Sequence, residues 1–226
     1  MARNDDLLLG DEVNAPALMQ RFTKLMRQHK GANARRNTKA SREWFYKNLT
    51  KRSEISADKV MREWTEKTAT SSGLIGKLYL FKYDAKHKDT LDYWDSAPLT
   101  LFFNSFVGDG QYGEQGVQYL IGINFHYMPP KVRLKVLELL LKLRSEKRYR
   151  ASTRLKVTWN ALKQLGNNPA FEHAVKMYRA DHVRSKLHEI HPGYYEQVIF
   201  LPIAEFQKGT NRTVWSDIGK KKKRKA

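Results

Sequence analysis

Three short apolar stretches, separated by polar turns, constrain the fold most. Residues 76–83 mix aromatic and aliphatic side chains, residues 99–103 form a second apolar run, and residues 118–125 form a third. Stretches of this length and composition are typical of β-strands. The sequence therefore predicts an α+β protein with a small, bent antiparallel sheet or partial barrel, packed with helices and extended by a basic N-terminal helical arm.

The segment between the first two strands is polar and rich in turn-forming residues. Asp84, Lys86, Lys88 and Asp89 are not easily buried without partners, so the segment is predicted to leave the sheet as a long hairpin or flap. Asp84, His87 and Asp89 allow two interpretations, a histidine general base with its helpers or an ordinary polar turn. The turn is favoured because Asp is a common turn former.

Helical patterns dominate the rest of the main domain. Residues 131–144, directly after Pro129 and Pro130, predict a helix that packs its leucines and valines on the sheet and leaves its cations on a solvated face. The remaining predictions are helices at 152–165 and 169–190, a strand at 197–203 and a short irregular piece at 206–215.

The N-terminal part has a different character. Residues 1–20 are acidic around a short apolar patch, which is either a mobile arm or a docking peptide, whereas residues 21–72 form a basic helical region. Within it Ser56 is a candidate helix N-cap, and Trp44 and Phe45 either stack on bases or anchor their helix to the core. Anchoring is favoured because buried aromatic residues dominate packing.

These patterns predict one main domain with basic ends. The main α+β domain is expected at 73–217, after a short linker, and a basic tail at 218–226. The tail carries six consecutive cations, which order only against a polyanion.

The charge balance gives the strongest functional indication. The formal net charge is +19 and the pI is about 10. A basic surface that merely aids solubility is the alternative, but the cations here are concentrated in blocks rather than spread. The sequence therefore favours a nucleic acid as the partner.

Several classes of function lack their motifs. The chain has no cysteine, which excludes disulfides and thiolate sites, and no apolar run approaches the roughly 20 residues that span a bilayer. Phosphate-loop, nucleophile-elbow and dinucleotide-binding motifs are missing, and the glycines at 108, 110 and 113 indicate a flexible hairpin connection. His182, His188 and His191 lack a metal-site spacing, and His126 is interpreted as a hydrogen-bonded core or rim residue. We therefore expect no membrane contact, no cofactor, no metal and no enzymatic activity.

Several blocks of residues resemble a known family. They are residues 34–38 with 41–45, residues 81–91 with 93–95, residues 122–133, residues 182–185 and residues 200–202. In this order they resemble the DNA end protector family of contractile-tailed bacteriophages. The resemblance spans residues 34–215 and contains no catalytic signature.

The resemblance implies a virion protein of the head-tail region, assembled in the host cytoplasm. It implies binding to double-stranded DNA ends, protection from host exonuclease, and support of head completion and tail joining through portal, neck or tail proteins. The basic blocks then supply the DNA contacts, which we expect from Arg35, Arg36, Lys39, Arg42, Lys47, Lys86, His87, Lys88, Lys131, Arg133, Arg184, Lys220, Lys221, Lys222, Lys223, Arg224 and Lys225.

Two alternatives remain open. The first is a structural neck or baseplate protein that acts through protein–protein contacts. The second is an enzyme similar to small barrel ribonuclease toxins, with His87 or His126 as the base. The chain length and the lack of a matched acid and base pair argue against the enzyme.

Overall fold

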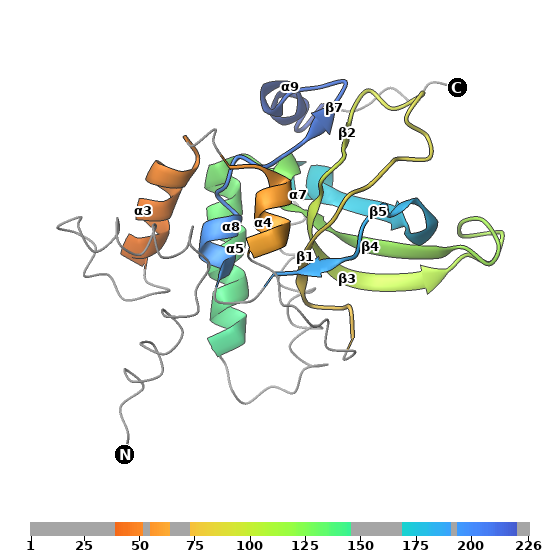
Figure 1. Ribbon diagram of the computed structural model, residues 1–226, viewed down its shortest axis with the longest axis horizontal. Coiled ribbons are helices and arrows are strands. Elements are labelled where there is room, and N and C mark those ends of the chain that lie inside the picture. Colours follow the sequence, from red (N-terminus) through yellow and green to blue (C-terminus); the bar gives the residue numbers. More distant parts are fainter. Residues whose placement is uncertain (1–38, 52–54, 64–72, 146–168, 191–193, 221–226) are drawn as a thin grey trace, which may run out of the picture.

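The chain folds into a mixed α+β structure (Figure 1). The computed structural model describes residues 39–51, 55–63, 73–145, 169–190 and 194–220. This part contains six α-helices, a five-stranded sheet and a two-stranded sheet. The predicted fold class is confirmed, except that the sheet does not close into a barrel within the described residues, because its outer strands pair on one side only.

The main sheet is antiparallel throughout, with the strand order β5-β4-β3-β1-β6. Its strands are β1 (Leu78–Leu80), β3 (Leu99–Val107), β4 (Gln118–Asn124), β5 (Val175–Arg179) and β6 (His188–Glu189). The three strands predicted from the sequence are confirmed. Strand β1 is shorter than predicted, β3 continues to Val107, and β4 ends at Asn124, where the 3-10 helix η1 (Phe125–Tyr127) begins.

The polar segment between β1 and β3 forms the predicted long connection. It consists of tight turns, in which the N–H of Lys88 donates to the Ala85 carbonyl and the N–H of Thr90 donates to the His87 carbonyl. It returns through β2 (Trp94–Asp95), which pairs with β7 (Phe206–Gln207). The turn interpretation of this segment is thus confirmed.

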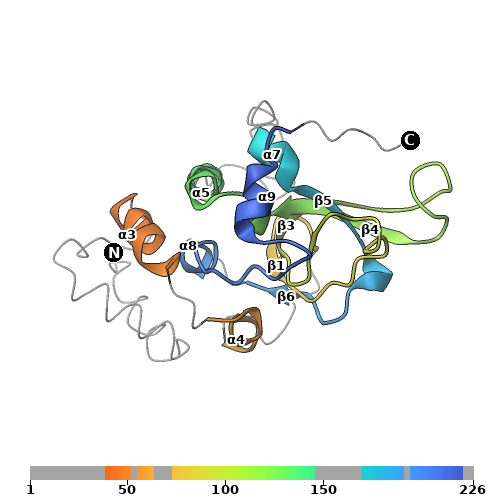
Figure 2. The same cartoon turned by 90° about the horizontal axis from the view of Figure 1, so that it is seen from above.

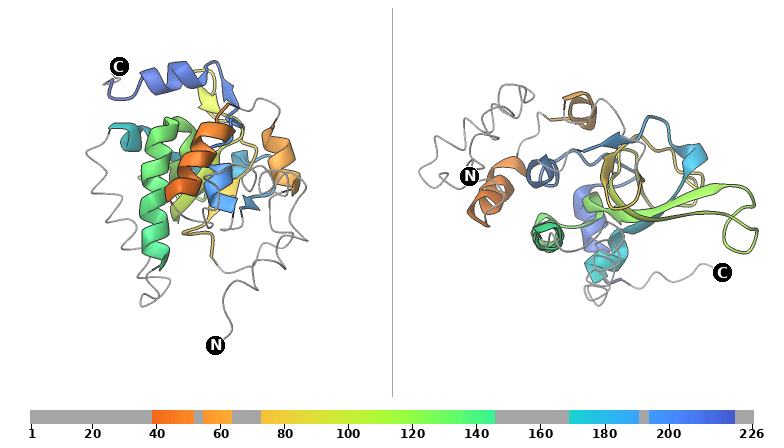
Figure 3. Two further views of the ribbon diagram at one scale, coloured as in Figure 1. Left: turned by 90° about the vertical axis from the view of Figure 1, so that its left-hand side faces the viewer. Right: turned by 90° about the horizontal axis from the view of Figure 1, so that it is seen from below.

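The helices are α3 (Lys39–Leu49), α4 (Ala57–Glu63), α5 (Pro130–Ser145), α7 (Pro169–Ala174), α8 (Tyr195–Val198) and α9 (Asn211–Ser216). Helix α5 confirms its prediction and begins at Pro130, whose missing N–H costs nothing in the first turn. Ser56 caps α4 as predicted, since its Oγ accepts from the N–H of Lys59 at 3.3 Å. Figures 2 and 3 show α3, α5 and α8 gathered beside one another, at the opposite end of the molecule from the β3–β4 hairpin.

Two predicted elements are wrong in type. Residues 169–190 form a short helix, α7, followed by strands β5 and β6 instead of one long helix. Residues 197–203 form the end of α8 and a buried turn instead of a strand. A short apolar run is equally compatible with a buried strand and a buried helix, so pairing with β4 and packing on the core decide these cases.

The predictions for residues 206–215 and 152–165 complete the comparison of secondary structure. The piece predicted as irregular, 206–215, contains β7 and helix α9, which Thr210 caps by accepting from the N–H of Thr213. The predicted helix at 152–165 lies outside the described residues.

The core lies on both faces of the sheet. On one face a large cluster joins sheet residues such as Leu101 and Ile123 to Phe45 and Leu49 of α3 and to Val60 of α4. The burial of Phe45 confirms that this aromatic residue anchors its helix. A smaller cluster covers the other face and consists of Tyr79, Phe81, Phe102, Leu120 and Tyr178. The predicted domain boundary near residue 73 stays a prediction.

Candidate nucleic-acid interface

Helix α3 separates its cations from its apolar residues. Phe45 and Leu49 lie four positions apart on the face that packs into the core, whereas Lys39, Lys47 and the following Lys51 are exposed. None of these three lysines has a carboxylate partner among the described residues. Their charges are therefore available to an anionic ligand.

Arg42 does not belong to this exposed set. Its guanidinium lies 3.4 Å from the carboxylate of Glu196 on α8 and 3.7 Å from that of Glu138 on α5. The Glu196 side chain is almost fully buried. Arg42 thus joins α3 to α8 and α5, so the prediction that it contacts DNA is replaced by a structural role.

Helix α5 lies beside α3 and adds further exposed cations (Figure 3). Lys131 and Lys135 are one turn apart and exposed, without a carboxylate partner in the described part of the chain. Together with Lys39, Lys47 and Lys51 they form what we call the α3–α5 cation set. The predicted solvated face of α5 is confirmed for these two lysines.

The burial of Arg133 contradicts the prediction that this residue contacts DNA. Only 3% of the residue is exposed, and its guanidinium donates to three backbone carbonyls, those of Met128, Ile199 and His126. Burial lowers its pKa to about 9, against a smaller opposing effect of Asp95. Arg133 therefore ties α5 to α8 and η1, and we remove it from the DNA contacts.

The long connection between β1 and β3, which we call the flap, carries cations that are exposed but mostly paired with carboxylates. Lys86 forms an ion pair with Glu114 of the β3–β4 hairpin, and Lys88 pairs with Asp84 at 3.1 Å. Arg184 lies near the same carboxylate, at 3.8 Å. The structure thus brings Lys86, Lys88 and Arg184 together at one end of the sheet, beside an exposed His87.

Glu114 links three elements at this end. Its carboxylate accepts from Arg179 of β5 and from Lys86 of the flap. These hydrogen bonds and charges lower the pKa of Glu114 to about 2. The positive charges of the flap are consequently balanced locally, unlike those of α3 and α5.

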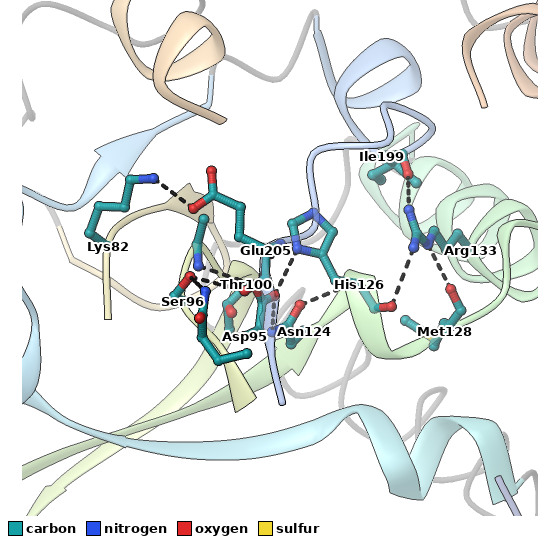
Figure 4. A network of polar contacts seen from close by, with 12 residues as sticks. Lys82, Asp95, Ser96, Thr100, Asn124, His126, Met128, Arg133, Ile199 and Glu205 are labelled. Atoms are coloured by element: carbon teal, nitrogen blue, oxygen red, sulfur yellow. Dashed lines mark hydrogen bonds and ion pairs between the residues drawn. The ribbon is translucent and has the colours of Figure 1, made fainter. Parts of the chain in front are cut away.

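A buried polar network lies at one end of the main sheet, where β3 begins and β4 runs into η1 (Figure 4). Nδ1 of His126 lies 2.7 Å from Oδ2 of Asp95, which also accepts from the side-chain amide of Asn124 at 2.9 Å. The same amide donates to the hydroxyl of Tyr178, which accepts from Thr100. All five side chains are buried, so they fasten β2, β3, β4, β5 and η1 to one another.

Two opposing effects act on the Asp95 carboxyl. Burial alone raises its pKa, but the charge of His126 and the hydrogen bonds from His126, Asn124 and the Ala97 N–H outweigh burial and hold the pKa below its ordinary value. The prediction of a hydrogen-bonded His126 is confirmed. Because none of the residue's surface is exposed, His126 does not reach a substrate in this conformation.

Some predicted sites lie outside the described residues. Arg35 and Arg36 precede α3, and the tail cations Lys221, Lys222, Lys223, Arg224 and Lys225 follow the last described residue. Lys220 is exposed and pairs with Asp217 at 2.8 Å. In the described part of the chain no cluster of three acidic, histidine or cysteine residues is arranged to hold a metal, and no helix there is long and apolar enough to cross a membrane.

The sequence did not reveal the central role of Asp95. It stands among turn-forming residues, where an aspartate ordinarily faces solvent. The only local signal is the apolar context that follows, Ala97, Pro98 and Leu99, all of them buried. Its partners are distant in sequence, so only the folded sheet brings them to Asp95.

A comparison with family models matches residues 9–221 to the Phage T4 terminal DNA protecting protein family. No curated protein and no solved structure matched the chain. The match covers nearly the whole sequence, including every described element and the buried Asp95 network. By this match, the chain belongs to the Phage T4 terminal DNA protecting protein family.

Proposed function

We propose that this protein binds the ends of packaged double-stranded DNA in a phage virion and protects them from host exonuclease. The family description, which refers to the protection of terminal DNA, supports this proposal. The net charge of +19 agrees with a polyanionic partner. In the same proposal the protein acts at the head-tail region and supports head completion and tail joining.

The observation that carries the proposal is the α3–α5 cation set. Lys39, Lys47 and Lys51 project from α3, and Lys131 and Lys135 project from the neighbouring α5. Lysines that lack local carboxylates release condensed counterions when they meet phosphates, and this release is the main source of non-specific DNA affinity. Lysines already paired with Asp or Glu contribute less, because binding must first break those pairs.

The cations outside the described residues extend this contact. Arg35 and Arg36 lie a few residues before Lys39, and the tail cations 220–225 add a second basic segment. In the proposal α3 and α5 hold the duplex on a folded surface, while the basic segments increase the number of neutralised phosphates. Arg42 and Arg133 position the helices and do not touch DNA.

Charge neutralisation on two faces tests this assignment. The variant Lys47→Gln, Lys131→Gln, Lys135→Gln removes three cations from the α3–α5 set. The control Lys59→Gln, Arg62→Gln, Lys186→Gln removes three cations from other parts of the chain, which also have no carboxylate partner among the described residues. Helix α4, which carries two of the control residues, lies on the other side of α8 from α5 (Figure 2). The measurement is the DNA dissociation constant across a salt series.

We expect the first variant to reduce the slope of log K against log salt by about 2–3, because each lost phosphate contact changes it by about 0.9. We expect the control to change the slope by less than about 0.9, the value for a single phosphate contact. Equal changes in both variants would contradict the assignment to α3 and α5 and would indicate a diffuse polyanion effect.

A structural neck or baseplate protein is the second candidate. One observation favours it, the exposure of apolar side chains on strands, with Val107 61% and Met177 56% exposed. This candidate predicts stable binding to portal, neck or tail proteins at a salt concentration that abolishes DNA binding. Loss of partner binding in Met177→Ser and Val107→Ser, with DNA affinity unchanged, would support it.

A further inference from the structure

The tip of the β3–β4 hairpin carries an aromatic side chain that the fold does not use. Tyr112 is 66% exposed, and it is the only exposed aromatic residue in the described part of the chain. Every other described Phe, Tyr and Trp is buried or partly buried. The Tyr112 side chain makes no ring contact or hydrogen bond within the described residues. A ring exposed in this way is able to stack on a flat aromatic ligand such as a base.

The loop that presents Tyr112 is held by several hydrogen bonds. Oδ1 of Asp109 accepts from the backbone N–H groups of Gln111 and Tyr112, at 3.0 and 2.7 Å. The hydroxyl of Tyr119 accepts from the N–H of Glu114, and Gly108 exchanges backbone hydrogen bonds with Gly116 and Val117 across the base of the loop. The Tyr112 backbone is therefore held in place before any ligand arrives, contrary to the flexible connection predicted from the glycines at 108, 110 and 113.

Side chains from two other elements brace the same loop. The Glu114 carboxylate is bound by Arg179 of β5 and by Lys86 of the flap. Gly113 has a φ of +92°, and a Cβ there would lie 2.5 Å from the Tyr119 ring, so this position requires glycine. Tyr119 itself stacks on Phe106 with ring centroids 5.1 Å apart. A loop fixed in this way loses little entropy when its tip binds a ligand.

The surroundings of the tip are balanced in charge. Lys86 and Arg179 are neutralised by Glu114, Arg179 is also paired with Asp181, and Lys88 is paired with Asp84. This end therefore differs from α3 and α5, whose exposed lysines have no carboxylate partner in the described part of the chain. It is unsuited to the phosphate-lined side of a duplex, whereas the terminal base pair of a blunt end presents an uncharged aromatic face.

We propose that Tyr112 stacks on the terminal base pair of a DNA duplex and so distinguishes an end from internal DNA. This inference rests on the proposed DNA-end function and adds the residue that recognises the end. Because the hairpin tip lies at the opposite end of the molecule from the α3–α5 cation set (Figures 2 and 3), the two contact separate stretches of DNA. An end exposes one base-pair face that internal duplex hides, and aromatic side chains stack on bases regardless of sequence. The hairpin projects from the body of the molecule, as Figure 1 shows, so the tip reaches a ligand without obstruction by the described elements.

The test compares two DNA probes. One is a short blunt duplex, and the other has the same sequence with both ends closed by loops. We expect wild-type protein to prefer the blunt duplex, and we expect Tyr112→Ala to reduce that preference by about 5- to 150-fold, the range for loss of one stacked base. Tyr112→Phe and Tyr112→Trp keep the preference, because stacking requires the ring and not the hydroxyl.

A matched control and a direct signal complete the experiment. Met177→Ala removes another exposed apolar side chain, on edge strand β5, and leaves the end preference unchanged. A fluorescent base analogue at the terminal position is quenched on binding by the wild type and not by Tyr112→Ala. Circular dichroism verifies that all variants remain folded.

The outcomes separate the two proposals. Unchanged end preference in Tyr112→Ala, with DNA binding intact, overturns the assignment of Tyr112. If wild-type protein binds neither probe, the proposed function itself fails. If it binds both probes equally, there is no end recognition for Tyr112 to supply, and the assignment fails while DNA binding stands.

Discussion

The fate of individual charged residues depends on their long-range partners. Arg42 and Arg133 belong to basic runs in the sequence, yet one is held between Glu196 and Glu138 and the other is buried against backbone carbonyls. Lys47, only five positions after Arg42, is exposed without a carboxylate partner among the described residues. Composition therefore predicts a polyanion partner but does not assign the residues that contact it.

Neutralising a structural arginine and neutralising an exposed lysine are expected to have opposite effects on stability and on DNA binding. We expect Arg42→Gln to lower the free energy of unfolding by about 1–3 kcal/mol, because the buried Glu196 carboxylate loses this cation. The same change leaves the salt slope of DNA binding unaltered. Lys47→Gln reduces the slope and leaves stability within about 0.5 kcal/mol. Urea unfolding and DNA titrations measure the two quantities, and a reversed pattern would refute the assignment.

The Asp95 carboxyl makes stability depend on pH. Its pKa in the folded protein lies below the ordinary value of 3.8, so the unfolded chain binds more protons in the acidic range. The stabilisation is therefore present above that ordinary pKa and is lost as the pH falls through the lower, folded value.

We expect Asp95→Asn to lose on the order of 3 kcal/mol of unfolding free energy at neutral pH, because His126 loses its buried acceptor. The stability of the variant should then fall less steeply with acid than that of the wild type. Urea unfolding at about pH 7 and about pH 3.5 measures both effects. Asp89→Asn, which changes an exposed aspartate in the connection between β1 and β3, is the control. Parallel pH curves for wild type and Asp95→Asn would contradict this account.

At the scale of elements, sequence patterns predict a helix or strand well when neighbouring residues alone determine it. The strands β3 and β4 and the helix α5 follow from aromatic runs, turn residues and Pro130. Strand β5 was predicted as helix, because its alternation of Val175, Met177 and Arg179 with Lys176 and Tyr178 becomes decisive only through pairing with β4. The cations of the candidate interface are visible in the sequence, but which of them are exposed, and the exposure of Tyr112, emerge only from the fold.

The buried turn after α8 provides a test at this scale. Phe200 is 1% exposed and packs in the large core cluster, so Phe200→Ala is expected to cost about 3–5 kcal/mol of unfolding free energy. The control is Leu91→Ala in the flap, which removes a side chain at the surface and changes stability by less than about 0.5 kcal/mol. Similar small changes in both variants, measured by urea unfolding, would show that residues 197–203 do not lie in the core.

At the scale of the whole molecule, two ends have different surfaces. The α3–α5 end carries lysines without carboxylate partners among the described residues, and the hairpin end carries paired charges with exposed apolar side chains. Figures 1 and 3 show these two ends on opposite sides of the molecule. If six to ten phosphates are neutralised, DNA affinity should fall by about 10³ to 10⁵ between roughly 50 and 200 mM salt. A flat response to salt would contradict a phosphate-based interface.

Protection of a linear duplex from a processive exonuclease tests the central claim most directly. The reaction contains an excess of closed circular DNA, which has no ends and competes for every non-specific contact. We predict that digestion stays blocked in the presence of the circle, because the protein remains at the ends. If the circle restores digestion at every salt concentration, the protein binds DNA as a general polyanion, and the DNA-end function is wrong.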